Sequence, residues 1–363
     1  MTFESRARGA VLDIHRAVEV MEMETSTKES RRVERFDRFR DRKQRNRRIG
    51  AILVAGALAV AAIVVVSNIF GKDEGIPASD APEGQLLYEV YAGGNTSALF
   101  AIDAAGGPFE DLGVDTDPGA RWFPDGTRIL VTSTAGPEAT ALPVRPASVA
   151  SDGSDFRLLD GVEDRSLNLN CSAISPDGRR LACEGYGDNE GVYTVRASDG
   201  GGLRALTDFT GFPGGFSPGG DEVIFLGEDS GGSIPGDVGT LYVVGTDGTG
   251  LREITPPSSV QWFSYASWSP DGEWIVFIHA DGHLSLVHPD GTELHRIALP
   301  ADASIDGATG GATWSPDGAW IAFTAREAGA DNPDVYLVRP DGTDLRQVTD
   351  TPGVAEFTPD WIS

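Results

Sequence analysis

The sequence predicts an all-β fold: a six-bladed β-propeller of four-stranded antiparallel blades, preceded by a single N-terminal transmembrane helix. Three observations lead to this prediction. A ten-residue phrase, clearest at 314–323, recurs along the chain. The prolines of its copies stand about 47 residues apart on average, which is enough for one propeller blade. Residues 49–71 carry no charged side chain and are long enough for a helix to cross a bilayer.

The repeated phrase, Trp-Ser-Pro-Asp-Gly in its clearest form, reads as a strand, a tight turn and a second strand. Proline presets φ at the first corner of the turn, and Asp and Gly tolerate the conformations that close it. The apolar run that follows suits a strand buried on both faces. Full copies begin at Trp122, Ile174, Phe216, Trp268 and Trp314, and a clipped copy stands at Phe357–Trp361.

A complete repeat contains four strands. In the clearest one we expect strand A to end at Trp314, with strand B at 320–323, strand C at 335–338 and strand D at 345–348. A second turn, Pro-Asp-Gly-Thr, joins strands C and D. In the second blade the pattern is fainter, and we expect strand C at 142–144, followed by an enlarged turn before strand D.

The two ends of the repeat region complement each other. The clipped copy at 357–361 supplies a strand A, but the chain ends before a strand B. Strand B and C material without a strand A opens the region, at 86–90 and 99–102. We therefore predict that the two ends pair, which completes one blade and closes the ring without an open edge.

These motifs resemble the TolB-type β-propeller repeat over about residues 85–363. The carrying pattern is W-S-P-D-G-x-x-[I/L]-[A/V]-F, followed by a strand, Asp-Gly-Thr and a final strand. The resemblance implies a six-bladed propeller that acts as a binding scaffold. Two features depart from the pattern: one copy reads Pro218-Gly219, and this chain carries an N-terminal anchor whereas TolB itself is soluble in the periplasm.

Charge divides the chain into four predicted parts: a cytoplasmic basic tail (1–48), the transmembrane helix (49–71), a linker (72–84) and an extracytoplasmic propeller (85–363). Residues 28–48 hold 11 basic and 4 acidic residues. Basic residues at one flank place that flank on the cytoplasmic side and against anionic inner-leaflet lipid. A cleaved secretory signal is the alternative, but its charged lead is normally only a few residues long. The expected location is the cell membrane.

The part of the chain after the basic tail is strongly acidic, with a formal net charge of −31 from residue 50 onward. Such a domain repels nucleic acid, which is therefore not expected as a partner. The one G-x-S-x-G string, at 215–219, overlaps a copy of the repeated turn, and no nucleotide-binding glycine motif in the required context occurs. We expect no cofactor.

The recurring turn aspartates invite a calcium interpretation, but each turn offers a single carboxylate and a calcium loop needs several converging oxygens. We interpret them as structural. Four of the five histidines fall in one blade but on the ends of three strands, so we do not expect a metal site. The turn aspartates are Asp125, Asp177, Asp271, Asp317 and Asp360, and the histidines are His279, His283, His288 and His295.

The two cysteines, Cys171 and Cys183, flank one of the repeated turns. Antiparallel pairing about that turn places them nearly opposite each other on one face. Outside the membrane such a pair can be oxidised. The sequence leaves two possibilities open, a disulfide or two buried thiols.

In a propeller, the A–B and C–D turns share one rim and the B–C and D–A loops share the other. The variable loops lie on the second rim, where function usually resides. We expect a protein, peptide or glycan ligand to contact acidic and aromatic residues there, although the acidic residues would also serve solubility alone. The candidates are Asp115, Asp117, Asp164, Phe212, Trp262, Phe263, Tyr265, Asp302 and Asp306.

Three functions are compatible with this sequence. The favoured one is a membrane-anchored binding scaffold for a protein, peptide or cell-envelope ligand. The second is a metal-dependent hydrolase or lyase with its site at the channel mouth, which requires three or more converging Asp, Glu, Asn or His side chains. The third is a transmembrane sensor in which ligand binding outside changes the basic inner tail.

Overall fold

The computed structural model divides the chain into two units, Met1–Asp80 and Ala81–Ser363, and only the second contains residues whose structure is described. The predicted basic tail and transmembrane helix, and most of the linker, lie outside the described residues. Within the described part, no helix is long and apolar enough to cross a membrane. The described residues are 81–93, 96–116, 118–132, 144–163, 167–186, 190–227, 238–261, 265–300, 303, 305–351 and 353–363.

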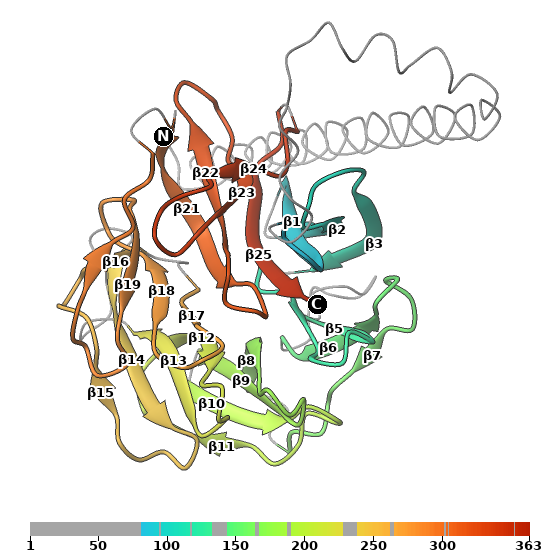
Figure 1. The fold of residues 1–363 in the computed structure, drawn as a ribbon. Helices are drawn as coiled ribbons and strands as arrows, with labels where there is room; N and C mark the ends of the chain where they lie inside the picture. Colours follow the sequence, from blue (N-terminus) through green and yellow to red (C-terminus); the bar gives the residue numbers. More distant parts are fainter. Residues whose placement is uncertain are drawn as a thin grey trace, which may run out of the picture. The chain divides into compact units, whose positions relative to one another are not determined.

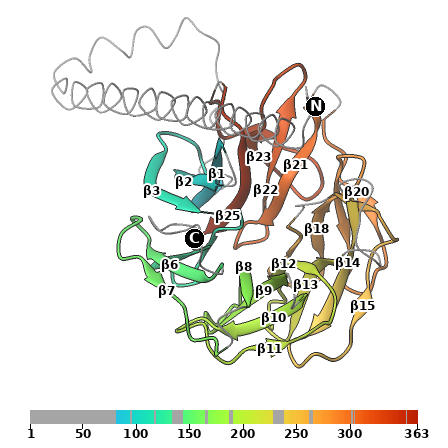
Figure 2. The same ribbon diagram turned by 180° about the vertical axis from the view of Figure 1, so that it is seen from behind.

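Six antiparallel sheets surround a central axis, so the predicted six-bladed propeller is confirmed (Figures 1 and 2). Each sheet contains one strand that lines the axis and three that follow it outward. The inner strands, position A, are β25 (Glu356–Ile362), β4 (Arg121–Trp122), β8 (Asn168–Ile174), β12 (Gly211–Phe216), β17 (Ser267–Trp268) and β21 (Ile305–Trp314).

The second strands, position B, are almost wholly buried because both of their faces pack against neighbouring blades. They are β1 (Gln85–Gly93), β5 (Arg128–Thr132), β9 (Arg180–Tyr186), β13 (Glu222–Gly227), β18 (Ile275–Ile278) and β22 (Ile321–Glu327).

The third strands, position C, also alternate into the core. They are β2 (Thr96–Asp103), β6 (Pro146–Ala150), β10 (Gly191–Arg196), β14 (Val238–Gly245), β19 (Leu284–Val287) and β23 (Asp334–Val338). The outermost strands, position D, are mostly two residues long. They are β3 (Glu110–Thr116), β7 (Arg157–Leu158), β11 (Arg204–Ala205), β15 (Arg252–Glu253), β20 (His295–Arg296) and β24 (Arg346–Gln347), and β16 (Val260–Gln261) additionally pairs with β14.

The ring closes as predicted, by a blade built from both ends of the repeat region. Strand β25 pairs antiparallel with β1, with Trp361 opposite Leu86 and Glu356 opposite Val90. The Trp361 indole donates a hydrogen bond to the carbonyl oxygen of Glu83 at 2.9 Å. The first blade therefore has the strand order β25-β1-β2-β3.

The expected position of strand C in the second blade was wrong. The strand is β6, Pro146–Ala150, a few residues after the predicted segment 142–144, and its pairing with β5 places Val149 opposite Ile129. The turn that follows is short, since the Gly153 amide bonds to the Ala150 carbonyl at 2.8 Å. Small alanine and serine side chains give this buried strand little apolar bulk, which is why its pattern is weak in the sequence.

The hydrophobic core lies between the facing sheets of neighbouring blades. One cluster joins β18 and β19 of the fifth blade to β22 and β23 of the sixth, around Phe323 and Trp314. Similar clusters join the first blade to the second, the second to the third, the third to the fourth and the fourth to the fifth. The apolar positions of each repeat are thus used twice, to build a blade and to attach it to the next.

The repeated turn is held by its own side chains. In the sixth blade, Ser315 Oγ donates to Asp317 Oδ1 at 2.6 Å and accepts from the Trp320 amide at 2.8 Å. Gly318 has a φ of +72°, a conformation that favours glycine. In the copy that lacks this aspartate, Asp221 occupies its role and accepts from Ser217 Oγ at 2.9 Å.

Candidate functional site: the central channel

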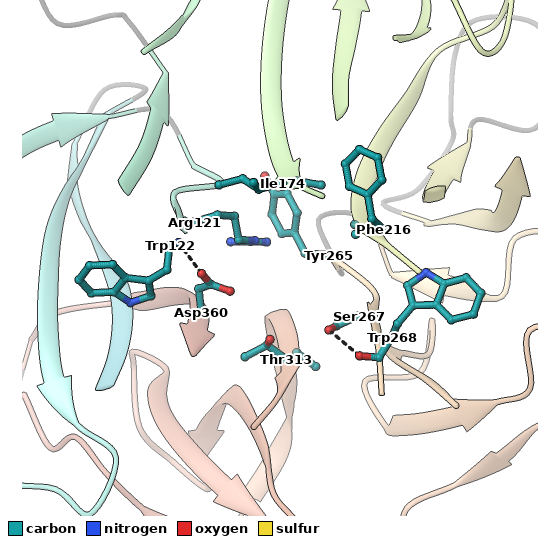
Figure 3. Close-up of a pocket in the computed structure, with 13 residues that line it drawn as sticks. Arg121, Trp122, Ile174, Phe216, Tyr265, Ser267, Trp268, Thr313 and Asp360 are labelled. Atoms are coloured by element: carbon teal, nitrogen blue, oxygen red, sulfur yellow. Dashed lines mark hydrogen bonds between the residues drawn. The ribbon is translucent and has the colours of Figure 1, made fainter. Parts of the chain in front are cut away.

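The inner strands of all six blades line a pocket of about 160 Å³ at the central axis (Figure 3). Its wall combines large side chains with glycine, alanine, serine and threonine positions, where the six strands converge. Gly214 is required at this point, since a Cβ on it would lie 2.2 Å from the carbonyl oxygen of Ala266 in the next blade. The pocket's polar side chains come from a few inner strands.

Three of these side chains, Arg121, Tyr265 and Asp360, point into the channel from three different blades (Figure 3). The Arg121 guanidinium lies over the Tyr265 ring, 5.0 Å from its centroid. Asp360 accepts a hydrogen bond from the Trp122 amide at 2.7 Å. Burial raises the pKa of Asp360, and the positive charge of Arg121 opposes that shift. The channel thus presents a cation, an aromatic ring and a carboxyl group within one small space.

A buried carboxyl group positions the segment that carries Arg121. Glu89, on β1, is only 1 % exposed, and its Oε1 accepts hydrogen bonds from the amides of Gly119 and Ala120, each at 2.8 Å. Burial raises the pKa of Glu89 to about 7, against the opposing effect of these amides and of Arg121. Glu89 is therefore a positioning residue that fixes the entry of the second blade into the channel.

Of the candidate rim residues, the structure brings Tyr265 to the channel. Asp115 lies opposite Ala98 in the outer part of the first blade, and Phe212 is partly buried against the core of the fourth and fifth blades. The side chain of Asp306 is outside the described structure, although its backbone belongs to β21. Five more of the candidate rim residues lie outside the described residues: Asp117, Asp164, Trp262, Phe263 and Asp302.

The interpretation of the turn aspartates separates into two groups. Asp125, Asp177, Asp271 and Asp317 accept hydrogen bonds within their own turns, which lower their pKa values. The assignment of Asp360 to a turn was wrong, because it lies in β25 and faces the channel. Its copy of the phrase lacks the glycine that closes the turn, and that missing glycine was the signal in the sequence.

Sequence reasoning also missed Arg121 and Glu89. Arg121 directly precedes the tryptophan of the first repeat, at the position that faces the axis. Glu89 is a charged residue inside the apolar strand Leu86–Val90, and a buried charge of this kind needs specific partners. Both signals were present in the sequence, but only the ring geometry shows that they converge.

Two of the histidines in the fifth blade share one partner. His279 and His283 both contact the Asp281 carboxylate, at 2.9 and 3.0 Å. His288 stacks on Trp274 at 3.9 Å between ring centroids. Among the described residues, no group of three His, Cys, Asp or Glu side chains could hold a metal ion.

The two cysteines face each other across β8 and β9 and are joined by a disulfide bond. Both are buried in the core between the second and third blades. Neither cysteine lines the channel pocket, and the bond joins the first two strands of the third blade.

No protein-family model matches the sequence, and no curated protein matches it either. Solved structures do match. The chain is similar to TolB from Acinetobacter baumannii, with 18 % identity and a TM-score of 0.59, over 79 % of this chain and 68 % of that one. A putative TolB from Agrobacterium tumefaciens shares 18 % identity with a TM-score of 0.54, over 78 % and 99 % of the two chains.

The fold is a TolB-type six-bladed β-propeller. A chain from a nidogen/laminin complex matches with a TM-score of 0.53 at 9 % identity, over 77 % of this chain and 99 % of that one, so the architecture also occurs in very different settings. A propeller fold by itself defines no chemistry, so what the protein can bind depends on the residues of the channel. Within the described part of its wall there is one carboxyl group, Asp360, whereas hydrolysis at a metal centre requires several converging ligands.

Proposed function

We propose that this protein is a binding scaffold: a propeller, displayed outside the membrane by a helix at 49–71, that engages a protein or peptide ligand at the channel mouth and the variable loops around it. The observation that carries this proposal is the trio of Arg121, Tyr265 and Asp360 in the channel. A cation, an aromatic ring and a carboxyl group together match the termini and side chains of a peptide. The TolB-like fold supports the same proposal.

The proposal has three further parts that follow from the sequence. The basic segment 28–48 contacts anionic inner-leaflet lipid, the propeller has no nucleic-acid partner, and residues 72–84 space the propeller from the membrane. A cysteine-free variant with single cysteines at Ser151 or at Ser26 tests the topology. In intact cells, a membrane-impermeant thiol reagent should label the first and spare the second; the reverse pattern would exclude an external propeller.

Site-specific photocrosslinking in cells tests the ligand site. A photoreactive amino acid replaces Thr313, which lines the channel, or Thr343, which lies exposed in a turn of the same blade. We expect a defined protein or peptide to crosslink at position 313 and not at position 343. Arg121→Gln should decrease that crosslink several-fold, and Arg326→Gln, which removes the same charge from the exposed end of β22, should not. Equal crosslinking at both positions would rule out the channel as the site.

A further inference from the structure

The second and third blades form a groove on the side of the ring that carries the repeated turns. Its volume is about 820 Å³, within the range of small-molecule sites. Five of its lining side chains are arginines, and we call it the arginine groove. They are Arg128, Arg157, Arg179, Arg180 and Arg196. The groove shares no lining residue with the channel pocket, and the proposed function above does not use it.

This concentration of arginine is unusual for this domain. Residues 81–363 contain 43 acidic residues, 14 arginines and no lysine, so carboxylates outnumber cations about three to one. In the arginine groove, arginines outnumber carboxylates instead. The five arginines are accompanied by Asp177 in the lining, and by Asp155 and Asp199, which pair with groove arginines. A local excess of positive charge remains.

Two of the five arginines stabilise the blades through hydrogen bonds. Arg128 donates to Ser148 Oγ at 3.0 Å and to Asp155 Oδ2 at 2.9 Å, so it fastens the second blade. Arg180 donates to the Gly220 carbonyl at 2.5 Å and so connects the third blade to the fourth. Their fixed positions hold the groove in shape, and they add to its positive potential.

The other three arginines are open to solvent. The side chains of Arg157 and Arg196 are 61 % and 58 % exposed although each pairs with an aspartate, Arg157 sharing Asp155 with Arg128. Arg179 is also exposed and makes no ion pair with the residues that the structure describes. Ion pairs this exposed are weak, so these guanidinium groups can exchange their partners for a bound anion at little cost.

The groove has an apolar base beneath the arginines. Phe123, Leu159 and Ala197 line it and pack against the core between the two blades. A guanidinium fork binds phosphate and carboxylate oxygens in pairs, and an apolar base accommodates the organic part of a ligand. The acidic remainder of the domain repels anions, but this repulsion is screened beyond about 8 Å at physiological ionic strength.

We propose that the arginine groove binds a small polyanion, a ligand in which two or more neighbouring phosphate or carboxylate groups contact Arg157, Arg179 and Arg196. A ligand with a single negative charge gains too few contacts to overcome the repulsion of the surrounding carboxylates. Selectivity for clustered negative charge therefore follows from the balance between the groove and its acidic surroundings.

Calorimetric titration of the full chain in a nonionic detergent tests this proposal. The probes are inorganic tripolyphosphate, citrate and monomeric dihexanoyl phosphatidylinositol 4,5-bisphosphate, at one fixed ionic strength. They represent free phosphate, carboxylate and a lipid headgroup. We expect saturable binding of at least one probe, weakening as salt is added, and no detectable binding of acetate. Absence of binding for all three probes would overturn the proposal.

Matched double variants connect that binding to the groove. Arg157→Gln with Arg179→Gln should weaken binding about tenfold or more, because charge-assisted contacts are lost. Arg296→Gln with Arg326→Gln removes the same charge from the fifth and sixth blades and should leave affinity within about twofold. Equal weakening in both variants would show a general charge effect, and unchanged affinity in both would place the binding elsewhere, such as the basic segment 28–48; either result would refute the site. Unchanged circular dichroism and unfolding midpoints confirm that the variants are folded.

Discussion

Two buried carboxyl groups, Glu89 and Glu356, lie in the blade that closes the ring. Glu89 is on β1 and Glu356 on β25, and both are almost inaccessible to solvent. Glu356 accepts a hydrogen bond from the Thr349 hydroxyl. In each carboxyl group the second oxygen has no hydrogen-bond partner among the described residues. Burial raises both pKa values to about 7.

These shifts predict that the propeller loses stability as pH rises. The pKa of a glutamate is near 4.5 when exposed and about 7 here, so the folded state retains protons that the unfolded state releases between these values. The stabilisation is complete below about pH 4.5 and is lost as pH rises through about 7. Each group contributes on the order of 3 kcal/mol across this range. Urea unfolding followed by tryptophan fluorescence between pH 5 and 8 measures this loss.

Replacement of one carboxyl group by an amide measures the contribution of that group to the pH dependence of stability. Glu89→Gln keeps an oxygen that can accept from the Gly119 and Ala120 amides but removes the titration. We expect a shallower decrease of unfolding free energy with pH, by up to half if the two glutamates contribute equally. Glu83→Gln, at an exposed position before β1, is the control and should leave the slope unchanged. A slope identical in all three proteins would contradict the assignment to Glu89.

At the scale of the element, the serine of the repeated turn links the turn to the following strand through the hydrogen bonds of its hydroxyl group. Ser315 is 2 % exposed, and its hydroxyl accepts the amide of buried Trp320. Ser315→Ala leaves that amide without a partner, so we expect a loss of about 1–3 kcal/mol in unfolding free energy. Thr343→Ala removes a hydroxyl that also bonds to a turn aspartate, but at an exposed position, and should cost less than about 1 kcal/mol. Chemical denaturation distinguishes the two variants, and equal losses would argue against the role given to Ser315.

The disulfide between Cys171 and Cys183 closes a short segment, since the cysteines are 12 residues apart. The structure therefore predicts no free thiol in the denatured, unreduced protein. Closure of such a loop restricts the unfolded chain and stabilises the fold by roughly 2–3 kcal/mol. Thiol titration and denaturation with and without reductant measure both effects. Two titratable thiols in the unreduced protein would show that the pair is not bonded.

The sequence was sufficient for the elements that repeat and insufficient for those that do not. The turn at 315–318 recurs, so its spacing predicted six blades and the closing strand. Strand β6 was misplaced because Ala147 and Ser148 obscure its apolar pattern. The groove arginines are scattered from Arg128 to Arg196 in the sequence, and only the packing of two blades brings them together. Sites between blades are therefore the part that periodicity cannot predict.

At the scale of the whole molecule, the closing blade determines whether the ring is complete. Strand β25 contributes to more than one blade: its backbone pairs with β1, Asp360 accepts from the Trp122 amide of the second blade, and Trp361 is buried. Strands β1, β2 and β3 of the closing blade lead directly along the chain into the second blade. Strand β25 of the same blade instead follows the sixth blade in the chain. The ring therefore depends on noncovalent contacts at this one junction.

Removal of residues 355–363 should open the ring at that junction. The edge of β1 would then be unpaired, and such an edge promotes aggregation. We expect a much lower unfolding midpoint, and partial recovery when a synthetic peptide of residues 354–363 is added in excess, because binding to the folded state stabilises it by mass action. The same peptide with Trp361→Ala loses a buried side chain worth about 3–5 kcal/mol and should not restore the midpoint. Thermal unfolding of the truncated chain, alone and with each peptide, measures these midpoints. A truncated chain as stable as the intact one would mean that five blades and an incomplete sixth hold together without ring closure.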